Sequence, residues 1–245
     1  MRSIFLDMPS DDLPVSLSLR AAPIHDRGVS HMTIDDKDLL NSIMASLERI
    51  NHIKPESIPD IDLYMDQVTT FMESSLSPSK RYPDDKVLTK TMINNYTKDG
   101  LLPPPEKKKY SREHMLLLIF IYYFKNILCI NDLHHILDPL SEKYFSSKDG
   151  MNLTDIYNEV FSLEKDEVQY LAKDITKKFN RSREIFKDAP PEDREALQYF
   201  ALICMLSFDT YVEKMLIEKM IDLDKAKHPR ETAPTKKSAR GRKIQ

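Results

Sequence analysis

The chain has 245 residues, of which 41% are hydrophobic and 31% are charged, and its formal net charge is -3. This length suits one large core or two small ones, and the presence of only two cysteines, Cys129 and Cys204, argues against a disulfide scaffold. The longest apolar run, Met115 to Phe124, falls well short of the roughly 20 residues of a membrane-spanning helix, and residues 1–31 lack the features of a secretory signal. We therefore expect a cytoplasmic protein without a membrane partner.

Charge is distributed unevenly along the chain. Residues 80–114 contain nine cations and five acids, whereas residues 138–223 contain 12 cations and 18 acids. The last 21 residues, 225–245, contain eight cations and one acid. Two basic segments around an acidic one are expected when one region touches a polyanion, although chance clustering of solvated charges gives the same pattern.

Helical patterns dominate, so the predicted fold class is all-α. Only Gly100 and Gly150 lie between the two ends of the chain, and a many-stranded sheet needs more turn signals than that. Residues 1–31 show no sustained periodicity of apolar residues and are predicted to be a flexible leader. Met32 is a candidate for the first residue of the natural protein.

Two helices are predicted before the first basic segment. The first is capped by Asp35 or Asp36, carries apolar residues at three-to-four spacing as far as Ile50, and stops before Pro55. The second runs from about Ile61 to Leu76. Prolines and paired aspartates then predict a loop over residues 77–87.

The segment from residue 88 to residue 112 is predicted to contain a helix, a turn and a basic loop. Thr89 is a suitable N-cap, and Gly100 stands where a left-handed residue often ends a helix. Three prolines and three lysines follow, and Ser111 is placed to cap the next helix. A polar helix beside a basic loop is typical of a winged helix-turn-helix, in which the helix reads base edges and the wing binds phosphates.

Two resemblances to known families are found, and the first supports this interpretation. The run INNYTKDGLLPPP, residues 93–105, resembles the recognition helix and turn of MerR-type regulators, and YSREHMLLLIFI, residues 110–121, is similar to the helix after their wing. The run IPDIDLYMDQVTTFM, residues 58–72, followed by LTKTMINNY, resembles an uncharacterised bacterial family, domain of unknown function 1836, over about residues 40–220. Asn94 stands where the MerR pattern has arginine, the wing lacks the family's Gly-Tyr-Arg triplet, and the loop between the first two helices is far longer than the usual three to four residues.

The region beyond residue 150 is predicted to be a helical C-terminal domain. Helices are expected from Thr154 or Asp155, from about Lys165 to Phe186, and from Glu192 to about Leu223. The apolar residues of the last helix cover well over one face, which favours a homodimer through these helices. A core helix within a monomer explains the same breadth, and both alternatives stay open.

No catalytic, metal or cofactor site is predicted. Cys129 and the pair His134-His135 are close in sequence, but a structural zinc site needs four ligands at a recognisable spacing. The acids Asp60, Asp62 and Asp66 are assigned to a helix N-terminus, where the helix dipole favours them. No glycine-rich phosphate loop or Ser-His-Asp set is present, so we do not expect an enzyme.

The sequence thus predicts a transcriptional regulator that binds double-stranded DNA. Its expected parts are the leader 1–31, a MerR-like winged helix-turn-helix over 32–138, a helical domain over 150–223 and a basic disordered tail over 224–245. The candidate DNA-binding residues are Thr89, Lys90, Thr91, Asn94, Asn95, Tyr96, Lys98, Lys107, Lys108, Lys109, Tyr110 and Arg112. The alternative is a non-enzymatic adaptor that docks proteins on the same helical surface.

Overall fold

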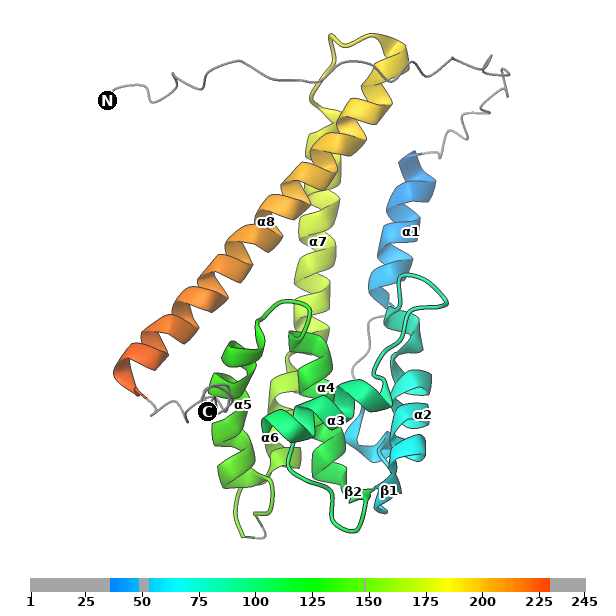
Figure 1. Cartoon of the computed structure of the whole chain (residues 1–245). Coiled ribbons are helices and arrows are strands. Elements are labelled where there is room, and N and C mark those ends of the chain that lie inside the picture. The colour runs from blue at the N-terminus through cyan, green and yellow to red at the C-terminus, as the bar shows by residue number, and fades with distance from the viewer. Residues whose placement is uncertain (1–35, 49–52, 148, 230–245) are drawn as a thin grey trace, which may run out of the picture. The chain divides into compact units, whose positions relative to one another are not determined.

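The structure, a computed structural model, describes residues 36–48, 53–147 and 149–229, and most of these residues lie in helices (Figure 1). In chain order the elements are α1 (Asp36–Glu48), η1 (Pro55–Ser57), β1 (Leu63–Tyr64), α2 (Met65–Leu76), η2 (Ser77–Ser79), α3 (Lys90–Asp99), β2 (Lys109–Tyr110), α4 (Arg112–Phe124), α5 (Ile130–Tyr144), α6 (Leu153–Ser162), α7 (Glu164–Arg183) and α8 (Pro191–Lys227). The mainly helical fold class is therefore confirmed. None of the helices in the described ranges is both long enough and apolar enough to cross a membrane.

A short strand replaces the first turn of the helix predicted from Ile61. β1 pairs antiparallel with β2, with Leu63 opposite Tyr110 and Tyr64 opposite Lys109. α2 begins only at Met65, because Tyr64 is extended and its backbone N–H donates to Gln67 Oε1 at 2.9 Å. The predicted start was wrong because two residues of strand leave no periodic signal in the sequence.

The central helix of the core is α4. Every residue from His114 to Ile121 is buried, as expected for a helix that is apolar on all sides. Packed around it are residues from the segments before and after, which include Leu63, Val68, Met72, Ile93, Leu101 and Leu102. β1, α2, α3 and β2 therefore share one core with α4.

α6 packs into this same core. Tyr157 and Phe161 of α6 form an aromatic cluster with Phe120 of α4, with ring centroids 4.4 to 5.9 Å apart. The buried Tyr157 hydroxyl donates to the Ile53 carbonyl at 2.6 Å and so joins α6 to the segment before η1. The predicted division between 138 and 150 stays a prediction, but the buried cluster includes residues from both sides of it.

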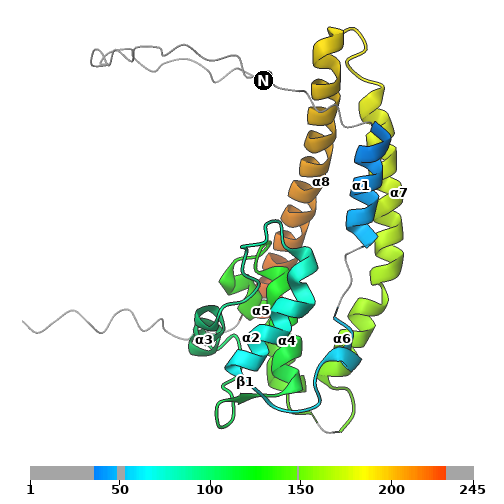
Figure 2. The ribbon, with the colours of Figure 1, turned by 90° about the vertical axis from the view of Figure 1, so that its right-hand side faces the viewer.

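α7 contacts both α8 and α1, and Figure 2 shows α1 beside α7. Ile175 and Phe179 of α7, Leu202 of α8 and Leu47 of α1 are buried. α7 ends at Arg183, three residues before the predicted end, and the nearby Phe186 has a positive φ of 57°. α8 runs to Lys227, past the predicted end at Leu223.

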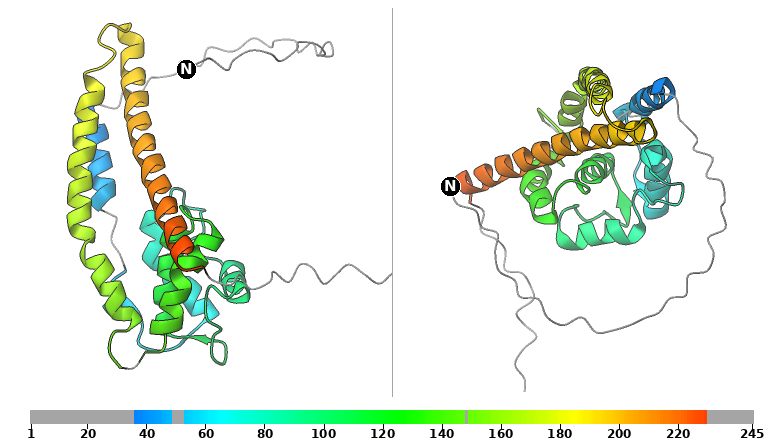
Figure 3. Two further views of the ribbon diagram at one scale, coloured as in Figure 1. Left: turned by 90° about the vertical axis from the view of Figure 1, so that its left-hand side faces the viewer. Right: turned by 90° about the horizontal axis from the view of Figure 1, so that it is seen from above.

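The C-terminal end of α8 packs on α5 (Figure 3). The Lys225 ammonium lies 2.5 Å from Asp132 of α5, and His135 of α5 lies 2.8 Å from Asp224. The hydrogen bond from Lys225 lowers the pKa of Asp132, and Ile221 beside these pairs is buried. The leader 1–31, the candidate start Met32, the cap Asp35, Ile50 and the tail beyond residue 229 lie outside the described residues.

Candidate nucleic-acid interface

α3 begins and ends where its sequence predicts. The Thr89 hydroxyl accepts a hydrogen bond from the Met92 N–H at 3.2 Å, which satisfies one of the free amides of the first turn. At the other end Gly100 is left-handed, with φ of 85°, and its N–H donates to the Thr97 carbonyl at 3.2 Å. A Cβ at position 100 would meet no atom within 4 Å, so the backbone angle is what requires glycine there.

One face of α3 is anchored and the other is exposed. Ile93 is fully buried, while Met92 and Tyr96 are half-buried against the core, and burial raises the pKa of Tyr96. The exposed face consists of Lys90, Thr91, Asn94, Asn95 and Lys98. These five side chains, all among the predicted residues, form a continuous polar surface that combines amides, a hydroxyl and two cations.

The turn after α3 fixes its C-terminal end. Leu101 and Leu102 are buried, and the Leu102 N–H donates to the Tyr96 carbonyl at 3.1 Å. Burial raises the pKa of Tyr110 in β2, and the nearby side chain of Thr97 of α3 opposes this rise. α3 is therefore tied to β2 by a side-chain contact as well as by the chain between them.

A tight hairpin turn exposes two lysines. The Lys109 N–H donates to the Glu106 carbonyl at 2.9 Å, and Lys107 and Lys108 between them have φ of 50° and 66°. Positive φ at both central positions is the pattern of a type I′ turn, which normally selects Asn-Gly. Left-handed backbone costs about 1–2 kcal/mol at each non-glycine residue. The turn therefore has lysines at two positions where the backbone conformation favours Asn and Gly. The sequence predicted only a basic loop here, because nothing in three lysines signals a left-handed backbone.

The remaining predicted residues mainly make contacts within the chain. Tyr110 is only 3% exposed and lies in the core, where its side chain is out of reach of a duplex. The half-buried Lys109 places its Nζ 5.4 Å from the centroid of the Tyr64 ring. Arg112 donates to the Pro55 carbonyl at 2.8 Å and lies 3.8 Å from Asp60.

The three acids near β1 occupy different places from those predicted. Asp60 and Asp62 precede β1, so only Asp66 lies in the first turn of a helix. Asp66 forms an exposed ion pair with Lys90 of α3. This pair joins α2 to the first turn of α3.

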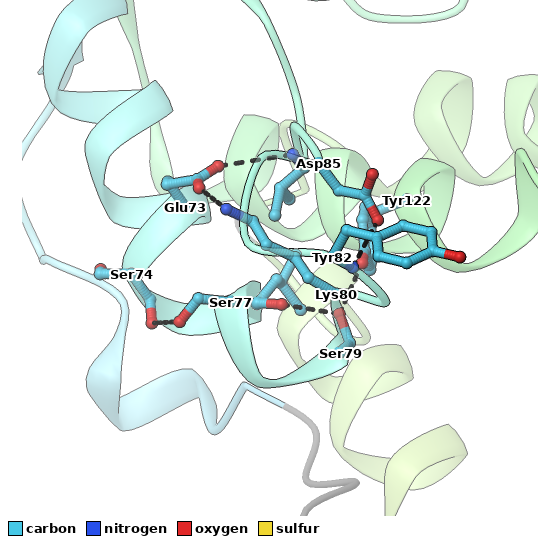
Figure 4. Close-up of polar contacts among 10 residues, drawn as sticks. Glu73, Ser74, Ser77, Ser79, Lys80, Tyr82, Asp85 and Tyr122 are labelled. Carbon is cyan, nitrogen blue, oxygen red and sulfur yellow. Dashed lines mark hydrogen bonds and ion pairs between the residues drawn. The ribbon is translucent and has the colours of Figure 1, made fainter. Parts of the chain in front are cut away.

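The long loop between α2 and α3 is held by polar contacts that the sequence did not reveal (Figure 4). Glu73 of α2 binds the Lys80 ammonium and accepts a hydrogen bond from the Val87 N–H at 3.4 Å. The Lys80 hydrogen bond lowers the pKa of Glu73. The Ser79 and Tyr122 hydroxyls lie 2.5 Å apart, which ties the loop to α4. These bonds fix the residues that lead into the N-cap of α3.

The side chains of Cys129, His134 and His135 each contact a different aspartate. Cys129 Sγ donates to Asp132 at 3.1 Å, His134 lies 3.1 Å from Asp138, and His135 pairs with α8. Within the described ranges, no group of three His, Cys, Asp or Glu side chains is arranged to hold a metal ion.

Residues 53–160 match the model of a family described as "Domain of unknown function (DUF1836)". The match confirms the resemblance within these limits, which are narrower than the 40–220 predicted from sequence. The two ends of the matched segment lie together in the structure, because the Tyr157 hydroxyl donates a hydrogen bond to the Ile53 carbonyl. No curated protein and no solved structure matches the chain. Residues 53–160 are therefore similar to an uncharacterised domain, DUF1836, and the match extends over less than half of the chain.

Proposed function

We propose that the chain is a DNA-binding transcriptional regulator and that residues 32–138 contain a MerR-like winged helix-turn-helix. In this proposal α2 and α3 are the helix-turn-helix pair, α3 is the recognition helix, and the turn of residues 106–109 is the wing. One observation carries the proposal: the exposed polar face of α3 belongs to the same packed unit as a hairpin whose two outward lysines are held in left-handed backbone. We also propose a cytoplasmic location, which the presence of only two cysteines led us to expect.

The exposed residues have distinct roles in this proposal. Asn94 and Asn95 carry the amide groups that make paired hydrogen bonds to N6 and N7 of adenine in the major groove. Lys90 and Lys98 at the two ends of α3, with Lys107 and Lys108 of the wing, bind phosphates. Tyr110 and Arg112, whose contacts lie within the chain, support the wing and β1 instead.

The test is the salt dependence of binding to a labelled random-sequence duplex. Changing Lys107, Lys108 and Lys109 to alanine is expected to weaken binding and to lower the slope of log K against log salt by about 1.8 to 2.7, since each phosphate contact contributes about 0.9. The matched control changes the exposed Lys173, Lys177 and Lys219, which removes the same charge from α7 and α8. That control is expected to leave the slope unchanged.

Two further variants distinguish sequence-specific DNA binding from non-specific attraction to phosphates. A chain ending at residue 229 lacks the basic tail, and it is expected to keep the wing-dependent part of the slope. Changing Asn94 and Asn95 to alanine is expected to change which sequences are recovered from a random pool, with little change in the salt slope. Absence of binding at low salt would refute the DNA proposal and leave the protein-docking adaptor as the better interpretation.

A further inference from the structure

α8 contains a long stretch that is almost free of charge. From Ala196 to Val212 the one charged residue is Asp209, and its carboxylate lies 2.5 Å from Lys178 Nζ of α7. Charged residues return on both sides, at 192–195 and at 213–214. Depletion of charge with enrichment of aromatic residues is typical of the centre of a protein interface.

The two sides of this stretch have different environments. Gln198 and Leu202 are buried, and the Gln198 side-chain amide donates to the carbonyls of Arg183 and Ile185 at the end of α7. A second stripe of α8 is exposed, and we call it the α8 seam: Phe200, Cys204, Phe208, Tyr211 and Met215. Its spacings of 4, 4, 3 and 4 residues keep the five side chains within about 80° of the helix circumference.

The exposed area of the α8 seam is large for a helix facing water. Phe200, Phe208 and Tyr211 are 60%, 65% and 66% exposed. At about 200 Å² for each aromatic residue, the three rings present roughly 400 Å². This is about half of the roughly 800 Å² that each partner contributes to a standard interface, before Met215, Cys204 and their neighbours are added. An apolar patch of this size on one face usually marks an interaction surface.

We propose that the α8 seam is covered by the same seam of a second copy of this chain, packed antiparallel about a two-fold axis near Phe208. An isologous interface requires a surface that complements itself when its direction is reversed. The seam meets this requirement, because Phe208 stands at its middle, Phe200 faces Met215 of the other copy, and Cys204 faces Tyr211. The arrangement also deepens the proposed function, on which this part rests, since it provides the two recognition helices that two half-sites need.

The first test is the mass of the full chain in solution, measured by light scattering without DNA. The expected mass is twice the 28.6 kDa of one chain. Phe208→Asp places a charge at the two-fold axis and is expected to give the single-chain mass. Met220→Asp is the matched control, because Met220 is 69% exposed on the same helix but lies about 120° around it from Phe208. Circular dichroism of both variants shows whether helix content is retained.

The second test is a cross-link at the axis. In a chain with Cys129→Ser and Cys204→Ser, Phe208→Cys is expected to form a disulfide between copies on mild oxidation, because residues on a two-fold axis meet the 4.4–6.8 Å Cα separation. Met220→Cys in the same background is expected to stay uncross-linked. A wild-type chain of single mass, or a cross-link at position 220 and none at 208, overturns the proposal.

The outcomes also separate this proposal from the proposed function. A single-mass wild-type chain that binds duplex DNA with the wing-dependent salt slope overturns the dimer alone. A double-mass chain with the position-208 cross-link and no DNA binding supports the dimer and overturns the DNA proposal alone.

Discussion

The two left-handed lysines of the hairpin allow one double variant to separate the effect of charge from the effect of backbone strain. Changing Lys107 to Asn and Lys108 to Gly installs the residue pair that a type I′ turn prefers. Left-handed backbone costs about 1–2 kcal/mol at each non-glycine residue. Glycine removes this strain, but it loses more conformational entropy on folding, which offsets about 0.5–1 kcal/mol of the gain in stability. We therefore expect the free energy of unfolding to rise by about 1 kcal/mol, measured by urea denaturation.

The same variant is expected to bind DNA more weakly although it is more stable. Loss of two phosphate contacts lowers the salt slope by about 1.8, which corresponds to about 60-fold weaker binding near 0.1 M salt. Fluorescence anisotropy on a random-sequence duplex between about 50 and 200 mM salt measures both quantities. The control changes both lysines to arginine, which keeps the two charges and the backbone strain, so affinity and stability should both stay near wild type.

Two results would refute the reasoning. A fall in the unfolding free energy of the Asn-Gly variant would mean that the backbone at residues 107 and 108 is not left-handed in solution. Unchanged DNA affinity with an unchanged salt slope would mean that these cations do not meet phosphates, whatever the turn does for stability.

Three further predictions concern stability, each measured by urea unfolding. Thr89→Ala removes the N-cap of α3 and is expected to cost about 1 kcal/mol, whereas Thr89→Ser should restore most of it; equal losses in both would contradict the capping role. Burial lowers the pKa of His114, so the native chain binds fewer protons than the unfolded chain, and stability should fall as pH drops below about 6.5. His114→Gln keeps an acceptor for the Ser111 N–H and should flatten that dependence; an unchanged profile would contradict the assignment. Tyr157→Phe leaves the Ile53 carbonyl without its donor and should cost about 1–3 kcal/mol, and a neutral effect would show that water replaces the hydroxyl.

The sequence predicted the elements that have strong local signals. The apolar residues of α2 follow helical spacing, and Thr89 and Gly100 mark the two ends of α3 through well-understood backbone chemistry. Five of the predicted DNA-binding residues form one exposed face because helical periodicity fixes which side chains share a side. These features need no knowledge of the tertiary fold.

Other features depend on contacts that a local pattern does not contain. β1 exists because Tyr64 meets Lys109, 45 residues later in the chain. Tyr110 looked like a surface residue beside three lysines, but it alternates into the core because a strand points successive side chains to opposite faces. α5 continues through Pro139 to Tyr144, although a proline lacks the backbone N–H that a helix interior normally uses.

The bond between Tyr157 and Ile53 has a consequence for the order of events during synthesis. These residues are separated by 104 positions, so the contact closes a very long loop and is expected to form late. At ribosomal speeds of 5–20 residues per second, about 5 to 20 s pass between the appearance of Ile53 and that of Tyr157. In the last part of that interval, after α4 has been made and before Tyr157 and Phe161 appear, Phe120 on the α6-facing side of α4 lacks its aromatic partners. The nascent domain therefore has a period of aggregation risk that ends when α6 docks.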